Sequence, residues 1–253
     1  MPSATNPESD PPLDAGRVLA QSLAVVGSNA GALAMMTVLI HLPLLAAQLY
    51  FIVVPTVEAR AQVEQLALFM GAGLFLSALS TTAVTHGVFQ QIQGKPASFG
   101  ECLRLGVART PTVLLINFVT LALMFLGSLA FFLPGLLAAT VLFVAAPAAV
   151  AEGRGVIAAL RRSAELTRGS RWAVFSLLIA PISLVVGLNL VALLAFGDLK
   201  AEHPLENQRF QAVSSILSVL YQALTSVTMA ITYFKLRLKH EGARKVDLTG
   251  ALD

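Results

Sequence analysis

Five long stretches without a charged residue are the feature of this chain that most constrains its fold. An α-helix needs about 20 apolar residues to cross a bilayer, and each stretch is longer than this. The whole chain of 253 residues is 56% hydrophobic and 12% charged, against about 25% charged residues in soluble domains. The sequence therefore predicts an all-α, polytopic membrane protein. The five stretches are residues 18–57, 65–94, 110–151, 172–197 and 210–234.

Prolines, glycines and short polar segments divide these stretches into six predicted transmembrane helices. The stretch 110–151 is twice as long as one span, so a tight turn is expected at residues 132–135. Pro111 is expected to start the first of its two helices and Pro147 to interrupt the second. The predicted spans are residues 30–54, 65–90, two within 110–151, 172–196 and 210–234.

Each predicted pair of spans is preceded by a segment with the pattern of an amphipathic helix. In the third segment, Ile157 and Leu160 share one side of the helix and Arg161 lies on the other. Such a basic amphipathic helix lies on a membrane surface. Gly169 is expected to end it, and Ser170 to cap the following span. The predicted fold is thus six transmembrane helices as three helix hairpins, each preceded by a short surface helix, at residues 14–27, 98–109 and 153–169.

Small residues in the second predicted span are expected to let a neighbouring helix approach closely; they are Gly71, Gly73, Ser77 and Thr81. Residues 1–13 are proline-rich and acidic and lack the basic start of a signal peptide, so they are predicted to be a disordered tail. Residues 14–240 form the predicted transmembrane domain, and residues 241–253 a cytoplasmic tail.

Basic residues gather on one side of this predicted topology. Fourteen Lys and Arg residues lie in the N-terminal segment, the 91–109 and 152–171 loops and the C-terminal tail, whereas three lie on the opposite side. Cytoplasmic loops are richer in Lys and Arg, so both termini are predicted to be cytoplasmic. The expected location is a bacterial cytoplasmic (inner) membrane. The net charge of +3 is explained by this topology and gives no reason to expect a nucleic-acid partner.

Three passages carry a resemblance to a known group of proteins: GKPASFGECLRLG, ALRRSAELTRGSRWAVFSLLI and ITYFKLRLKHEG. They resemble a bacterial group of six-helix membrane proteins that includes the membrane domain fused to some glycerophosphodiester phosphodiesterases. Lys235 stands where that group usually has an acid. The resemblance implies a six-helix membrane fold, and no part of the chain is similar to the catalytic phosphodiesterase domain.

Basic and aromatic residues around the third surface helix form a candidate surface for anionic lipids. Each such charge is worth about 1 kcal/mol near an anionic membrane, and tryptophan favours the membrane interface. Membrane lipids are accordingly the expected partners. A role of the arginines only in setting the orientation during insertion is the alternative. The candidate residues are Arg154, Arg161, Arg162, Arg168, Arg171 and Trp172.

The residue types that catalysis requires are scarce in the predicted spans. The six spans contain no Asp, Glu, Lys or Arg, and only His41 and His86 could titrate there. The four histidines and the single cysteine show no spacing of three or four residues, so neither a metal site nor a cofactor is expected. No nucleophile motif or phosphate-binding loop occurs. The sequence predicts a protein that is not an enzyme.

Polar side chains along the spans form a second candidate site. They either bond neighbouring helices together or line a polar cavity for a lipid head group or a small solute. A structural or lipid-handling role in the cell envelope follows from the first possibility, and a small-solute or lipid transporter, with these side chains lining its path, is the alternative. The candidate residues are His41, Gln48, Ser77, Thr81, Thr85, Ser218, Gln222 and Thr225.

Overall fold

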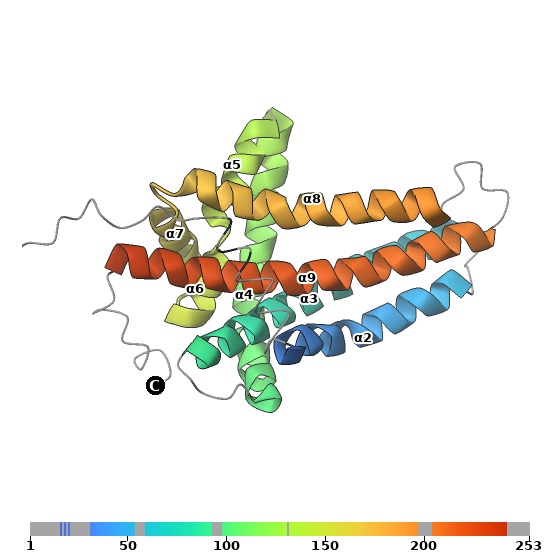
Figure 1. Cartoon of the computed structure of the whole chain (residues 1–253), viewed down its shortest axis with the longest axis horizontal. Coiled ribbons are helices and arrows are strands. Elements are labelled where there is room, and N and C mark those ends of the chain that lie inside the picture. The colour runs from blue at the N-terminus through green and yellow to red at the C-terminus, as the bar shows by residue number, and fades with distance from the viewer. Residues whose placement is uncertain are drawn as a thin grey trace, which may run out of the picture.

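A computed structural model of the chain describes residues 16, 18, 20, 31–53, 59–92, 98–130, 132–196 and 204–241 (Figure 1). Within these residues all regular structure is helical. The all-α class predicted from the sequence is therefore confirmed. The helices are α2 (Gly31–Val53), α3 (Ala59–Ile92), α4 (Phe99–Ala130), α5 (Phe132–Leu142), α6 (Ala145–Glu152), α7 (Val156–Leu166), α8 (Arg171–Phe196) and α9 (Pro204–Glu241).

Five helical segments among the described residues are long and apolar enough to cross a membrane. Many of their large apolar side chains, such as Phe118, Phe125 and Leu194, are exposed. Exposed apolar surface of this extent is typical of proteins that contact lipid. A further apolar helix, Met35–Tyr50, is shorter. The five segments are Ala67–Gln91, Phe99–Leu129, Leu133–Glu152, Arg171–Phe196 and Arg209–Glu241.

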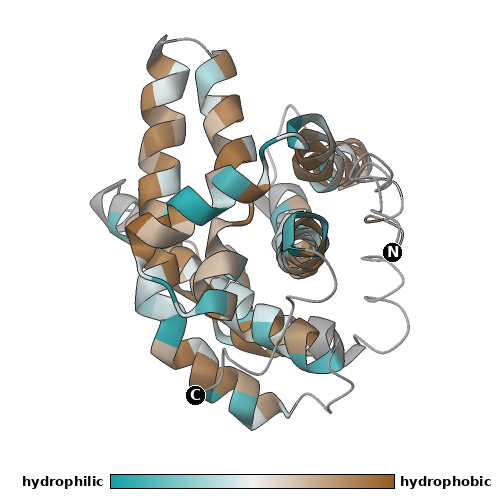
Figure 2. Cartoon of the chain, turned by 90° about the vertical axis from the view of Figure 1, so that its left-hand side faces the viewer, coloured by the Kyte–Doolittle hydropathy of each residue, from teal (hydrophilic) through white to brown (hydrophobic). Residues whose placement is uncertain are grey.

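The helices run in two directions. Figure 1 shows α2, α3, α8 and α9 along the long axis of the molecule, whereas α4 and α5 run across it. Figure 2 shows the α4–α5 pair projecting from the other helices. The buried core joins α2, α3, α4, α6, α7, α8 and α9, with Ile40, Val84, Leu177 and Val227 among its members. Five long apolar helical segments are found among the described residues, so the predicted arrangement of six spans in three hairpins stays a prediction.

Glycines bring α4 and α5 into close contact. A Cβ atom on Gly127 would lie 2.6 Å from the backbone nitrogen of Gly135, and one on Gly135 would lie 2.7 Å from the carbonyl oxygen of Met124. Only glycine fits at such an approach. The close approach predicted at Gly71 and Gly73 is wrong. A Cβ on Gly71 would have no neighbour within 4 Å, and one on Gly73 would meet only a leucine methyl group at 3.9 Å.

Proline acts differently at two positions. The prediction that Pro111 starts a helix is wrong, because α4 continues through it from Phe99. The predicted surface helix 98–109 is consequently the first part of α4 and not a separate element. Pro147 does interrupt its span, since α5 and α6 are separated at residues 143–144. Pro147 has no N–H to donate to the carbonyl of Phe143, which explains the break.

The third surface segment begins and ends close to where the sequence predicts. It forms α7, and Gly169 beyond it has a positive φ of 82°, which glycine adopts at little cost. Ser170 directly precedes α8, and its hydroxyl accepts a hydrogen bond from Lys239 Nζ at 3.1 Å. The first surface segment, 14–27, and both predicted tails lie mostly outside the described residues, although Val18 is fully buried.

Candidate functional site

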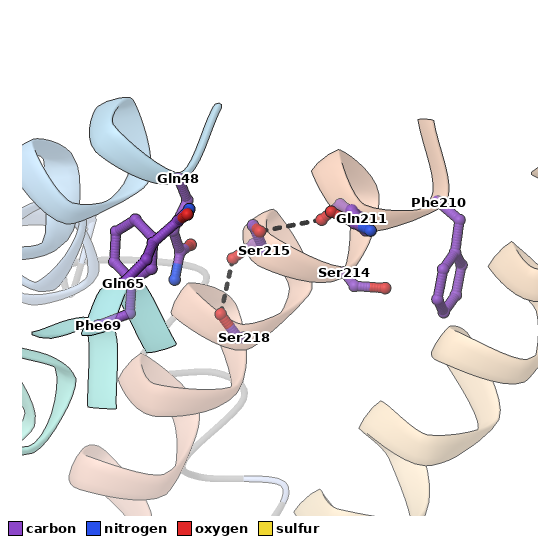
Figure 3. A pocket seen from close by; sticks show the side chains of 8 residues that line it. All are labelled: Gln48, Gln65, Phe69, Phe210, Gln211, Ser214, Ser215 and Ser218. Atoms are coloured by element: carbon purple, nitrogen blue, oxygen red, sulfur yellow. Dashed lines mark hydrogen bonds between the residues drawn. The ribbon is translucent and has the colours of Figure 1, made fainter. Parts of the chain in front are cut away.

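A polar cavity of about 420 Å³ lies between the last turns of α2, the first part of α3 and the first part of α9 (Figure 3). Its volume lies within the roughly 300–1,000 Å³ of typical ligand sites. Three glutamines, three serines and two phenylalanines line it, and none of them is charged. They are Gln48, Gln65, Phe69, Phe210, Gln211, Ser214, Ser215 and Ser218.

The hydroxyl groups on α9 differ in how they are satisfied. Ser215 donates to the carbonyl of Gln211 at 2.9 Å, and Ser218 donates to the carbonyl of Ser215 at 2.7 Å. The hydroxyl oxygen of Ser214 is buried and has no hydrogen-bond partner among the described residues. A buried hydroxyl without a partner loses about 1–3 kcal/mol, so a ligand that bonds it there is favoured.

An apolar groove of about 640 Å³ along α2 and α3 adjoins this cavity. The two share Gln65 and Phe69 in their linings. Most of the other groove residues are apolar, including Leu44, Leu68 and Phe75. A polar cavity beside an apolar groove suits an amphipathic molecule. We call the second part the α2–α3 groove.

Further along α9, polar side chains bond the helices directly to one another. Gln222 Nε2 lies 3.4 Å from Thr81 Oγ1 and 3.5 Å from the carbonyl oxygen of Ser77. Thr81 Oγ1 lies 3.4 Å from Ser226 Oγ. We call these four residues the polar seam. Such bonds between membrane helices average about 0.6 kcal/mol each, so the seam holds α3 against α9.

The remaining predicted polar residues lie apart from both the cavity and the seam. The hydroxyl groups of Thr85 and Thr225 are buried without a hydrogen-bond partner among the described residues. His41 bonds through Nδ1 to the carbonyl oxygen of Thr37, one turn earlier in its own helix, at 3.0 Å. Of the predicted residues, Gln48 and Ser218 therefore line the cavity. Ser77, Thr81 and Gln222 bond α3 to α9. The other three do neither.

An ionic cluster occupies the opposite end of the molecule, where α6, α7 and α9 meet. Glu152 accepts hydrogen bonds from Tyr233 Oη at 2.6 Å and from Arg162 Nε at 2.9 Å. Arg162 also pairs with Glu241, which Arg237 Nε approaches to 3.0 Å. The Glu152 side chain is only 8% exposed and that of Arg162 15%. These contacts tie three helices together through charges that are largely removed from solvent.

The predicted anionic-lipid surface is divided by this cluster. Arg162 belongs to the cluster, and Arg154 Nε lies 2.5 Å from the second carboxylate oxygen of Glu152. Arg161, Arg168 and Arg171 are exposed and make no hydrogen bond or ion pair with any described residue. The side chain of Trp172 is 83% exposed.

Sequence reasoning missed the ionic cluster and the cavity. Glu152, Tyr233 and Glu241 all border predicted spans on the side with most basic residues, which is the one signal that could have placed them together. The cavity gave a weaker signal, because Gln211, Ser214 and Ser215 follow Phe210 at the start of a span. The searched, described residues hold no group of three His, Cys, Asp or Glu side chains able to bind a metal ion.

Comparisons with other proteins give one match. Neither the curated proteins nor the solved structures contain a match to this chain. The family model that matches covers residues 97–236, more than half of the chain, and so includes the helices from α4 to α8 in full. The resemblance to the membrane domain of glycerophosphodiester phosphodiesterases stays a prediction. The chain belongs to the family described as a domain of unknown function (DUF7847).

Proposed function

We propose that this protein is a non-catalytic integral membrane protein of the bacterial cytoplasmic membrane that handles lipid. In this proposal the polar cavity holds a neutral, hydroxyl-bearing lipid head group and the α2–α3 groove holds an acyl chain. The observation that carries the proposal is that the two lie side by side and share Gln65 and Phe69 in their linings. A free solute would need only the cavity, whereas a lipid uses both.

The charges of the site favour a neutral head group over an anionic one. Glu64 is the one ionisable side chain among the residues that line the cavity and the groove. Its carboxylate repels a phosphate and leaves a sugar or glycerol unaffected. Amide and hydroxyl groups such as Gln48 and Ser214 match the donors and acceptors of a polyol.

Thermal unfolding of the purified protein in a neutral detergent tests this proposal. We expect a short-chain glucosyl diacylglycerol to raise the melting temperature, because a ligand at about 100 times its Kd stabilises a folded protein by about 2.7 kcal/mol. Dioctanoyl phosphatidylglycerol should have a smaller effect. The Gln48→Leu variant, which removes an amide from the cavity, should lose most of the shift.

Asn189→Leu is the matched control for this experiment. Asn189 bonds only to the carbonyl of Val185 in its own helix among the described residues, at 2.8 Å, and does not line the cavity. This variant should keep the full shift. Stabilisation by free glucose alone would favour the small-solute transporter instead. Equal shifts for Gln48→Leu and wild type would contradict the proposed site.

We further propose that both termini lie in the cytoplasm, as the distribution of basic residues indicates. The α4–α5 hairpin has no charged residue in 110–151, so this orientation holds whether or not the hairpin crosses the membrane. Six crossings would place its tip on the outer side. However, Leu133 at the tip lines the same cavity as Arg171, the first residue of α8.

Cysteine labelling distinguishes these two positions of the hairpin tip. In a Cys102→Ser background, we expect Leu133→Cys to be protected from a membrane-impermeant thiol reagent added outside the cell. In the proposed orientation the tip lies beside the cytoplasmic end of α8. This helix has 26 residues and is about 39 Å long, so the tip is separated from the outer surface by the thickness of the membrane. Lys200→Cys, in the predicted outer loop, should react. Strong outside labelling at position 133 would restore six crossings.

A further inference from the structure

A second groove lies on the other side of the molecule, between α5 and the first turns of α8. Its volume is about 490 Å³, and Leu133, Leu137 and Phe175 make its surface mainly apolar. Thr140 also lines it, but its hydroxyl already donates to the carbonyl of Leu136 at 2.9 Å. We call this the α5–α8 groove. It shares no lining residue with the polar cavity or the α2–α3 groove.

One of the residues that line the α5–α8 groove is positively charged. Arg171 lines it together with Trp172. Arg171 is exposed and has no hydrogen-bond or ion-pair partner among the described residues, in contrast to Arg162 in the ionic cluster. The guanidinium of Arg171 can form paired hydrogen bonds to a phosphate, which the apolar side chains of the groove cannot.

The neighbouring side chains indicate the depth at which this site lies in a membrane. Leu133, which lines the groove, is 76% exposed. Trp172 packs edge-on against Phe175, with ring centroids 6.0 Å apart. Tryptophan favours the level of the lipid head groups, so an apolar surface starting there meets the first part of an acyl chain.

We propose that the α5–α8 groove binds one anionic phospholipid, with an acyl chain along Leu133 and Leu137 and its phosphate against Arg171. The charge of Arg171 selects this occupant, since the apolar wall alone would accept any lipid equally. One basic residue near the surface gives about a fivefold preference for an anionic lipid. The site is independent of the neutral-lipid site between α2, α3 and α9.

The position of Trp172 makes the proposal directly measurable, because it is the only tryptophan in the chain. Lipids with brominated acyl chains quench tryptophan fluorescence on contact. The protein is placed in phosphatidylcholine bilayers containing a small fraction of either brominated phosphatidylglycerol or brominated phosphatidylcholine. We expect a given fraction of brominated phosphatidylglycerol to quench about as strongly as a fivefold larger fraction of brominated phosphatidylcholine.

Two arginine variants separate the groove from general attraction to the surface. Arg171→Gln should abolish the preference. Arg168→Gln should retain it, because Arg168 is equally exposed but does not line the groove. Equal quenching of the wild type by both lipids would overturn the proposal, as would an equal loss of preference in both variants. Quenching by neither lipid would show that no acyl chain reaches the groove and would also overturn the proposal.

Discussion

Replacing Glu152 by leucine should lower the stability of the protein by about 3–5 kcal/mol, the usual effect of removing one partner of a buried ion pair. The Glu152 side chain is 8% exposed. Its carboxylate pairs with Arg162 and Arg154 and accepts a hydrogen bond from Tyr233. Without it, Arg162 keeps only Glu241 and the more distant Glu165, and the Tyr233 hydroxyl loses the one partner described for it. Thermal unfolding in detergent would measure the loss.

Glu165 provides the matched control for this variant. It lies 3.9 Å from the same arginine, but its side chain is 58% exposed. Exposed pairs contribute roughly 0–1 kcal/mol, so Glu165→Leu should melt close to the wild type. Adding Arg162→Met to Glu152→Leu should recover part of the loss, because no buried guanidinium then lacks its main partner. Similar melting of the two single leucine variants would show that the ionic cluster does not hold the helices.

Gly135→Ala should also be strongly destabilising. The added methyl group would lie 2.6 Å from Ser128 Oγ and 2.7 Å from the carbonyl oxygen of Met124, which is backbone of α4. The two helices must therefore separate, and overpacking of this kind costs about 1–3 kcal/mol or more. The effect would be measured as a fall in melting temperature, with the same fall expected for Gly127→Ala.

The control for the hairpin is the same substitution at a glycine with space around it. A Cβ on Gly71 would meet nothing within 4 Å. Because alanine favours a helix by about 1 kcal/mol over glycine, Gly71→Ala should leave the stability unchanged or raise it. The two substitutions are thus expected to act in opposite directions. A loss at position 71 equal to that at position 135 would contradict the packing of α4 against α5.

The sequence predicts the helices better than it predicts their arrangement. Long stretches of sequence without charged residues predict apolar helices, because burying an unpaired charge in lipid is costly. The glycine at 169 likewise predicts where the segment after α7 turns, since its φ is positive. Hydropathy, by contrast, gives no direction to a helix, so it does not predict that α4 and α5 run across the long axis of the molecule. Pro111 was misplaced because a proline can remain within a helix when its neighbours support it.

The candidate sites depend on contacts between residues far apart in the chain. Gln48 and Ser218 are polar positions that the periodicity of two helices identifies, but their meeting at one cavity depends on how α2 packs against α9. Glu152 and Glu241 are 89 positions apart, and both meet Arg162. A single sequence contains no information that pairs them. The residue types could be predicted, whereas their partners required the fold.

The length of α9 has a mechanical consequence. Its first part lines the polar cavity through residues as early as Phe210, and its last turn carries Glu241 of the ionic cluster. These two residues are separated by about 46 Å of continuous helix at 1.5 Å per residue. Among the described elements, α9 alone reaches both places. The helix therefore connects the two places rigidly. A tilt of α9 that widens the polar cavity at one end strains the salt bridges of the ionic cluster at the other.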